Sequence, residues 1–477
     1  MKVRTLFIIA IYCCFIANSL AQTTGEVTSN LSSQLDSLVE AHLPAFSHVG
    51  IYAYDLTDNQ PIYAYEAEKL SRPASTMKLI TAISALAHPQ GSEPFRTEVW
   101  AQGFIEQDTL YGDVYVIGAM DPEFNDEALD SLVSILSSLS FSHVKGRLYG
   151  DVSMKDSIYW GSGWAWDDNP NAYQPYLSPL MLHKGAVEVE VIPTTKGMPA
   201  ELSAKPLSTY YNIRNNTLSA SPEAGKYELS RNWLENGNEL VASGNVARKR
   251  TDRVNVYKPE RFFMHTLQER LQARGVQFDA PYAFQELHRN DSCFLLATYE
   301  TPIQMVLDEM MKESDNLNAE AMFYRLALQA TGERHLSSDE AIEQIEQSIE
   351  RLGYNPSNYR VVDGCGLSNY NAVSPELLVA FLRFAYTHPD IYHAIYQSLP
   401  IAGIDGTLQS RMRRGSPAYR KVRAKTGTVT GICTLAGYLT MPNGHQVAFA
   451  ILNQNHLRHR DARLLQDKVC EFLCGYR

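Results

Sequence analysis

The stretch RPASTMKLITAISAL, Arg72 to Leu86, decides how this chain is interpreted. Its apolar residues recur at helical spacing, and Ser75 and Lys78 stand at the predicted first turn. Residues i and i+3 share one face of a helix, so we expect Lys78 to lean over Ser75. The amide groups of a first helical turn also favour a developing negative charge. The stretch therefore offers a serine nucleophile with an amine beside it.

A serine hydroxyl is a weak nucleophile until a base takes its proton, and a lysine acts as a base only when it is neutral. Burial and a neighbouring cation both lower the pKa of a lysine. Lys425, in the string Lys425-Thr426-Gly427, is a candidate for that cation and for attracting an anionic substrate. The string reads as part of an edge strand, whose backbone groups pair with peptides. We expect the backbone N–H groups of Ser75 and Thr428 to form an oxyanion hole.

A third string, Ser314-Asp315-Asn316, falls at a predicted break between two helices. Side chains at such a break can point into a cleft. Ser314 is suited to relaying a proton, and Asn316 to binding an amide of the substrate.

Each string also has a structural explanation. Ser75 could serve only as an N-cap. The Ser314 string could serve only to end one helix and begin the next. Lys425 could be only a charge that protects a sheet edge from aggregation. Another Ser-x-x-Lys string begins at Ser142, but a strand-like run follows it. Three strings in this order and in these contexts favour a catalytic constellation.

The N-terminus has the features of a secretory signal. Lys2 and Arg4 precede an apolar run, and Ser19-Leu20-Ala21 offers a cleavage point near Ala21. We therefore expect export to the periplasm or cell envelope as a soluble protein. No later stretch reaches 18 apolar residues, so no membrane span is expected.

Composition excludes some classes of function. The formal charge of −11 argues against a nucleic acid as partner. We expect no metal and no cofactor, because no CxxC, HExxH or P-loop pattern appears. Of seven cysteines, five remain after the signal, so at least one thiol stays unpaired or pairs between chains.

The predicted secondary structure changes character twice along the chain. Residues 49–55 and 61–66 read as a hairpin, followed by the Ser75 helix to about His88. Short strands and turns then run to about residue 290, with one helix near 261–274. After Thr301 the chain turns helical, and it ends with two strands and a helix at about 461–473. We expect an α+β fold, in which an antiparallel sheet from both chain ends is flanked by helices and the middle is an insertion.

In this order, the three strings resemble the motifs of the penicillin-recognising serine enzymes. Longer stretches are similar to the D-alanyl-D-alanine carboxypeptidase/endopeptidase family, the class C low-molecular-mass penicillin-binding proteins. They include GDVYVIGAMDPEF, GWAWDDNPNAYQPYLSPL, DEMMKESDNLNAEAMF and VRAKTGTVTGICTLAGYL. The resemblance implies a penicillin-binding transpeptidase/β-lactamase-like domain with two β-rich inserted domains. It divides the chain into a signal peptide at 1–21, a peptidase domain at 22–90 and 291–477, one insert at 91–189 and 256–290, and a second at 190–255.

The resemblance also implies a DD-peptidase that acts on peptidoglycan peptides. Ser75 would attack the carbonyl of D-Ala or of a cross-link, with Lys78 as base. Ser314 would pass the proton to the leaving amine, and Asn316 would line the cleft. Water would release the acyl-enzyme, and β-lactams would acylate Ser75 as covalent inhibitors.

The remaining substrate contacts follow from the same resemblance. Lys425 and Thr426 would hold the terminal carboxylate, and Gly427 lies at the same substrate-binding motif.

The first insert would contribute Asp167, which helps to recognise the third residue of the peptide, with Trp164 beside it. The alternative for GWAWDD is an exposed aromatic turn. Asn369 replaces a usual arginine, which puts recognition of a carboxylate there in doubt. Cys365 replaces a usual serine, and we expect it to be a buried thiol.

Two rival functions stay open at this point. One is a β-lactamase-like hydrolase or esterase, which would need a group that activates water against a penicilloyl ester. The other is a non-catalytic cell-wall binding protein on the same fold. The sequence does not fix the oligomeric state.

Overall fold

The computed structural model describes residues 30–476, so the predicted signal peptide lies outside the described residues. The chain forms two compact units. Of the described residues, the terminal unit comprises 30–76, 372–392 and 399–476. The central unit comprises residues 77–371 and 393–398. The predicted boundaries at residues 90, 189, 255 and 290 are not tested by this division and stay a prediction.

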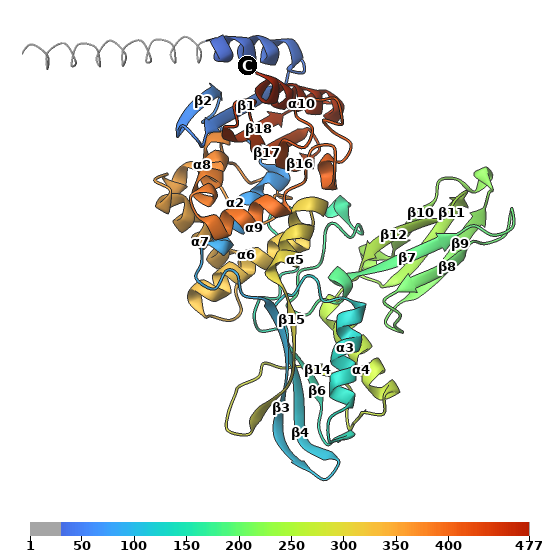
Figure 1. The fold of residues 1–477 in the computed structure, drawn as a ribbon. Coiled ribbons are helices and arrows are strands. Elements are labelled where there is room, and N and C mark those ends of the chain that lie inside the picture. The colour runs from blue at the N-terminus through green and yellow to red at the C-terminus, as the bar shows by residue number, and fades with distance from the viewer. Residues whose placement is uncertain (1–29, 477) are drawn as a thin grey trace, which may run out of the picture. The chain divides into compact units, whose positions relative to one another are not determined.

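The terminal unit contains the expected antiparallel sheet made from both chain ends. Its five strands lie in the order β16-β17-β18-β1-β2, with every neighbouring pair antiparallel. Figure 1 shows the blue strands of the chain start beside the red strands of its end. The strands are β1 (His48–Asp55), β2 (Gln60–Tyr65), β16 (Val422–Val429), β17 (Ile432–Thr440) and β18 (Gln446–Gln454). The edge position predicted for the Lys425 strand is confirmed.

Helices cover both faces of this sheet. Successive side chains of a strand point to opposite faces, so neighbouring residues of β1 contact different helices. On one face, Val49 and Ile51 share a core cluster with Leu465. On the other, a Cβ at Gly50 would lie 2.8 Å from Cγ of Pro375. The two helices are α10 (His459–Gly475) and α8 (Pro375–Tyr386). Residues 30–42, which we did not predict as an element, are also helical.

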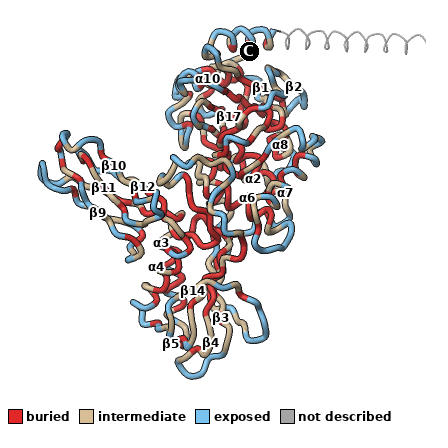
Figure 2. Tube along the Cα trace, turned by 180° about the vertical axis from the view of Figure 1, so that it is seen from behind, coloured by how far each residue is buried: buried red, intermediate tan, exposed pale blue. Residues whose placement is uncertain are grey.

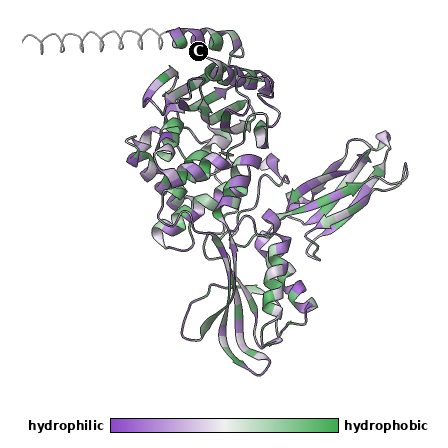
Figure 3. Cartoon of the chain, in the orientation of Figure 1, coloured by the Kyte–Doolittle hydropathy of each residue, from purple (hydrophilic) through white to green (hydrophobic). Residues whose placement is uncertain are grey.

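The helical part of the central unit is built around a buried helix. All ten residues of α2 (Met77–Leu86) are buried, and α2 contacts α6 and α7. Figure 2 shows this core in red. Figure 3 shows that the helices of this unit carry both hydrophobic and hydrophilic residues. The other helices are α5 (Ile303–Asp308), α6 (Asn316–Thr331), α7 (Ser338–Arg351) and, crossing into the terminal unit, α9 (Pro389–Ser398).

The middle of the chain is rich in strands, as expected. A seven-stranded sheet has the order β13-β5-β4-β3-β15, with β6 and β14 attached. Two three-stranded sheets have the orders β10-β11-β9 and β12-β7-β8. The strands are β3 (Phe95–Glu106), β4 (Thr109–Ile117), β5 (His143–Val144), β6 (Leu148–Asp151), β7 (Ala186–Ile192), β8 (Glu201–Lys205), β9 (Asn212–Ser219), β10 (Glu228–Arg231), β11 (Glu239–Val246), β12 (Arg250–Asn255), β13 (Gln277–Phe278), β14 (Ala283–Phe284) and β15 (Cys293–Thr301).

The expectation of a single helix in this middle region is wrong. The predicted helix is present as α4 (Pro259–Ala273), but α3 (Asp126–Ser137) packs against it. The side chain of Asn125 caps α3 by accepting a hydrogen bond from the backbone N–H of Ala128. Leu129, Leu132 and Leu136 are buried on one face. An N-cap residue followed by apolar residues at this spacing is a sequence signal for a helix, so α3 could have been predicted.

Two further features concern the described residues as a whole. Between residues 30 and 476, no helix is both long enough and apolar enough to cross a bilayer. Five cysteines lie in this range, and each is free of a disulfide bond: Cys293, Cys365, Cys433, Cys470 and Cys474. Within one chain these cysteines are therefore unpaired, and the alternative of a pairing between chains stays open.

Candidate active site

The serine lies in a short helical turn that leads directly into a buried helix. The turn η1 (Ala74–Thr76) precedes α2 without a gap, so Ser75 and Lys78 stand in one continuous helical segment. Ser75 is the middle residue of η1 and does not occupy an N-cap position. Ala74 has φ +45°, a conformation uncommon for a residue other than glycine. Such backbone outliers concentrate at functional sites.

Strand β16 packs against this turn in the terminal unit. A Cβ at Gly427 would lie 2.8 Å from the backbone nitrogen of Ser75 and 2.1 Å from Oγ1 of Thr434. Thr434 donates a hydrogen bond to the carbonyl of Pro73 (2.8 Å), immediately before the turn. Only glycine at position 427 therefore allows strand β16 to lie this close to the turn. The third motif thus lies against Ser75, the predicted nucleophile.

The other residues of the third motif differ in exposure. Lys425 is fully buried, and its Nζ donates to the carbonyl of Thr426 (2.7 Å). Thr426 donates through Oγ1 to Oγ1 of Thr407 (2.8 Å), and Thr428 is exposed. Backbone groups of residues 400–402 bond to the first half of β16, at Val422 and Ala424. The first half of β16 is therefore occupied. A peptide that pairs with this edge strand would have to bind beyond Ala424, at Lys425-Thr426-Gly427.

Lys78 is fully buried in the central unit and lies among defined acceptors. Its Nζ donates to Oδ1 of Asn316 (2.6 Å) and to the carbonyl of Cys365 (2.8 Å). Burial lowers the pKa of Lys78, and this outweighs the opposing effects of the Cys365 thiol and the carboxylates around it. The first and second motifs therefore meet through Lys78 and Asn316, and the amine has the lowered pKa that a base requires.

The predicted helix break at the second motif is confirmed. The π-helical turn η6 (Glu309–Glu313) ends at Ser314, which adopts a left-handed conformation with φ +63°. Asp315 then caps α6 by accepting a hydrogen bond from the backbone N–H of Asn318 (3.0 Å). Asn316 is the first residue of α6, so the break sets the directions of Ser314 and Asn316.

A lysine that the sequence analysis missed holds this break in place. Nζ of Lys184 forms ion pairs with Asp315 (3.0 Å), Glu123 (2.9 Å) and Glu309 (3.1 Å). Burial alone would lower the pKa of Lys184, but the three carboxylates together raise it. Its partners lie 61 to 131 residues away in the chain, so no local motif identifies it.

Two buried carboxylates that were also missed shape the loop around Cys365. Asp363 accepts hydrogen bonds from the backbone N–H groups of Gly366 (2.8 Å) and Ser368 (2.7 Å). Glu320 of α6 accepts from the backbone N–H groups of Gly364 (2.9 Å) and Cys365 (2.8 Å). Burial, with the charge of Asp363, raises the pKa of Glu320 to about 8. Together they orient the carbonyl to which Lys78 donates.

The Cys365 thiol is fully buried, as expected. Burial raises the pKa of this thiol well above its ordinary value. Because the thiolate is the reactive form of cysteine, Cys365 behaves as an inert core side chain.

Trp164 and Asp167 lie in a loop of the first predicted insert. Nε1 of Trp164 donates to Asp363 (2.9 Å). Asp167 is exposed in the short turn Trp166–Asp168. Further along the loop, the carbonyl of Tyr173 accepts a hydrogen bond from Nδ2 of Asn316 (2.7 Å). The loop therefore reaches the second motif, while the roles of Trp164 and Asp167 in substrate recognition stay predictions.

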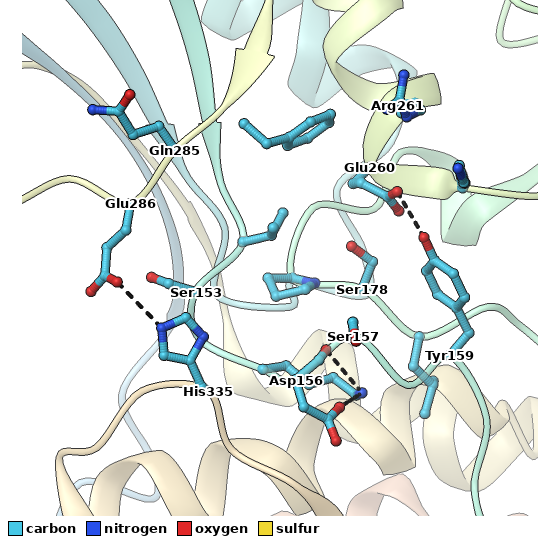
Figure 4. Close-up of a pocket in the computed structure, with 16 residues that line it drawn as sticks. Ser153, Asp156, Ser157, Tyr159, Ser178, Glu260, Arg261, Gln285, Glu286 and His335 are labelled. Atoms are coloured by element: carbon cyan, nitrogen blue, oxygen red, sulfur yellow. Dashed lines mark hydrogen bonds and ion pairs between the residues drawn. The ribbon is translucent and has the colours of Figure 1, made fainter.

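The central unit also contains a cavity of about 670 Å³ between the end of β6 and the start of α4. Figure 4 shows Tyr159 donating to Glu260 (2.9 Å) and His335 paired with Glu286. None of the predicted site residues lines this cavity. It is therefore separate from the constellation around Lys78.

The family model described as "D-Ala-D-Ala carboxypeptidase 3 (S13)" matches residues 31–474. The chain belongs to this family. It is therefore a peptidase of the D-Ala-D-Ala carboxypeptidase class, as the motifs predicted. The match extends over nearly the whole of the described chain, including the strand-rich middle.

Individual relatives agree with this assignment. The chain is 28% identical over 457 residues to the D-alanyl-D-alanine carboxypeptidase of Actinomadura sp. strain R39, covering 92% of this chain and 83% of that protein. It is 27% identical over 430 residues to the D-alanyl-D-alanine carboxypeptidase DacB of Haemophilus influenzae, covering 85% of each.

The fold is also found among solved structures. The crystal structure of penicillin binding protein 4 from Haemophilus influenzae matches with a TM-score of 0.80 at 24% identity, over 93% of this chain and 99% of that one. A second structure of that protein, complexed with a β-lactam, matches with a TM-score of 0.75 at 23% identity over the same shares. These matches confirm the predicted mixed fold of sheets and flanking helices.

Proposed function

We propose that this S13 enzyme hydrolyses D-Ala-D-Ala termini and D-alanyl cross-links of peptidoglycan through an acyl-enzyme on Ser75. The observation that carries the proposal is the environment of Lys78. Its amine is fully buried, its pKa is lowered by that burial, and Asn316 and the Cys365 carbonyl fix its position. The amine stands three residues after a serine in the same helical segment.

In the acylation step, Oγ of Ser75 attacks the carbonyl carbon of a D-alanyl residue, and its proton passes to neutral Lys78. The backbone N–H groups of Ser75 and Thr428 stabilise the negative charge on the carbonyl oxygen. When the C–N bond breaks, Ser314 passes a proton to the leaving amine. The amine departs as free D-Ala or as the other strand of a cross-link.

In the second step, water attacks the ester carbonyl, and Ser75 regains its proton as the peptide leaves. Lys425, Thr426 and Gly427 would hold the terminal carboxylate of the substrate during acylation. Lys425 would be charged in this role, and its burial would strengthen its attraction to an anion. A β-lactam would acylate Ser75 in the same way.

The peptidoglycan substrate agrees with the proposed location. A signal peptide at residues 1–21 would export the enzyme to the periplasm or cell envelope, where peptidoglycan lies. The experiment is to incubate the chain from residue 22 with purified sacculi and to identify the products by mass spectrometry. Release of D-Ala and of uncross-linked muropeptides supports the proposal, and unchanged sacculi would reject it.

A fluorescent penicillin separates the rival functions. Durable label on the protein supports a penicillin-binding DD-peptidase. Rapid turnover of the penicillin without lasting label would indicate a β-lactamase-like hydrolase. Absence of any acylation would indicate a non-catalytic protein.

Asp167→Ala tests recognition of the third peptide residue. The proposal assigns the exposed carboxylate to the third residue of the peptide, a group that a β-lactam lacks, so we expect kcat/KM for the peptide to fall about tenfold. The rate of penicillin acylation should stay unchanged. Asp291→Ala, an exposed aspartate in the same unit, is the matched control. Equal loss of both reactions would show that Asp167 does not act in substrate recognition.

A further inference from the structure

Three side chains with metal-binding atoms meet in the terminal unit. They are Cys433 near the start of β17, His456 in the connection after β18, and His459 at the first residue of α10. One Sγ and one nitrogen from each imidazole all lie within 4.8 Å of one another. The rings of His456 and His459 meet edge to face, with centroids 5.0 Å apart.

The two histidines leave buried nitrogens without hydrogen-bond partners. His456 is only 4% exposed, and neither its Nδ1 nor its Nε2 has a hydrogen-bond partner on any other described residue. Nδ1 of His459 is also buried and has no partner there. Buried polar atoms usually have a hydrogen-bond partner, so three such atoms in one cluster make it a candidate site for a ligand.

The three side chains offer one sulfur and two imidazole nitrogens, which are atoms that borderline metal ions bind. A ligand that carries N–H or O–H donors could satisfy the nitrogens, but it would not use the thiol.

The backbone holds the three positions together before any ion binds. Cys433 pairs with Thr428 across the β16–β17 hairpin and with Asn453 of β18. The backbone N–H of His456 donates to the carbonyl of Gly431 at the hairpin turn (3.3 Å). Gly431 has φ +76°, which permits this turn. The ligand atoms are therefore close before binding, which lowers the entropic cost of forming a site.

We propose that Cys433, His456 and His459 form a binding site for a borderline divalent metal ion of the Zn²⁺ class. One thiolate and two imidazoles are a ligand set that Zn²⁺ prefers, and three protein ligands leave a fourth tetrahedral position for water. On binding, the Cys433 thiol loses its proton to solvent and a sulfur–metal bond forms. The spacing of 23 and then 3 residues matches no familiar motif, so the sequence alone does not show the site.

The site would lie beside the motif strand. Oγ1 of Thr428 is 3.8 Å from Sγ of Cys433, and Thr428 is the residue proposed to complete the oxyanion hole. A bound ion would therefore tie the connection before α10 to the hairpin that carries Thr428. This proposal does not depend on catalysis, since it concerns binding alone.

The test uses the chain from residue 22, purified with a chelator that removes bound metal. Co²⁺ is then added as a spectroscopic probe of the proposed site. We expect about one equivalent of Co²⁺ to bind per chain and to produce a thiolate-to-cobalt charge-transfer band, which Zn²⁺ abolishes by displacement. Cys433→Ser should lose the band. Cys293→Ser, which removes a cysteine outside the cluster, should keep it.

A thermal shift gives an independent measure. Zn²⁺ should raise the melting temperature of the wild type and of Cys293→Ser, but not that of Cys433→Ser or His459→Gln. His459 is only partly buried, so His459→Gln serves if the buried cysteine variant does not fold. Absence of Co²⁺ binding in the wild type, or a charge-transfer band that persists in Cys433→Ser, would overturn the proposal.

Discussion

At the scale of single residues, the chemistry depends on the protonation of Lys78. A neutral amine has two N–H donors and one lone pair. Two of the acceptors beside it are Oδ1 of Asn316 and the carbonyl of Cys365. In the proposed mechanism, the lone pair takes the proton from Ser75. Burial favours this neutral form, because transfer of a charge out of water is costly.

We therefore expect the acylation rate to rise with pH as Lys78 loses its proton. The rising limb should lie below pH 10.5, the ordinary pKa of lysine, because burial lowers the pKa of Lys78. Lys78→Arg keeps the hydrogen-bond donors but stays charged at every accessible pH. It should slow acylation by on the order of a thousandfold. Stopped-flow measurement with a chromogenic β-lactam checks both results, and an Arg variant with normal activity would exclude Lys78 as the base.

At the scale of elements, the contact between strand β16 and the turn η1 sets the position of Ser75. This contact leaves no room for a side chain at Gly427, since a Cβ would meet the Ser75 nitrogen at 2.8 Å. Real Cβ atoms essentially never approach this closely, so the strand or the turn would have to move. Small displacements of a nucleophile cost large factors in rate.

Gly427→Ala should therefore reduce acylation by about a hundredfold, while the protein stays folded. The matched control is Gly475→Ala, where an added Cβ meets Pro417 at ordinary contact distances of 3.4 and 3.5 Å. Labelling rates with a fluorescent penicillin and circular dichroism together measure the effect. Equal labelling rates in the two variants would show that the packing of β16 on η1 does not position Ser75.

At the scale of the whole molecule, local patterns predicted most of the architecture. Short alternating or apolar runs beside turn residues identified β1, β17 and β18, and their location at the two chain ends predicted that they share one sheet. Lys184 could not be predicted, because its three carboxylates come from distant segments. Asp363 and Glu320 were missed for the same reason, since their importance comes from backbone groups that only the fold brings to them.

The buried Glu320 makes global stability depend on pH. Its pKa is about 8 in the folded state and about 4.5 when unfolded, so folded Glu320 keeps a proton that the unfolded chain releases between these values. The stabilisation is present below pH 4.5 and is lost as pH rises to about 8, by at most about 1.4 kcal/mol per pH unit.

Glu320→Gln keeps an acceptor for the amides of Gly364 and Cys365 but does not titrate. Relative to the wild type, the variant should therefore become more stable as pH rises from 5 to 8. Urea unfolding at several pH values measures the difference in free energy of unfolding. Parallel curves for the two proteins would show that Glu320 does not hold a proton in the folded state.

The most direct test of the catalytic assignment is intact-protein mass spectrometry after incubation with benzylpenicillin, followed by peptide mapping. The wild type should gain the mass of one penicilloyl group, located on the peptide that contains Ser75. Ser75→Ala should fold normally and gain no mass. An adduct on another residue, or an undiminished adduct in Ser75→Ala, would contradict the assignment of Ser75 as the nucleophile.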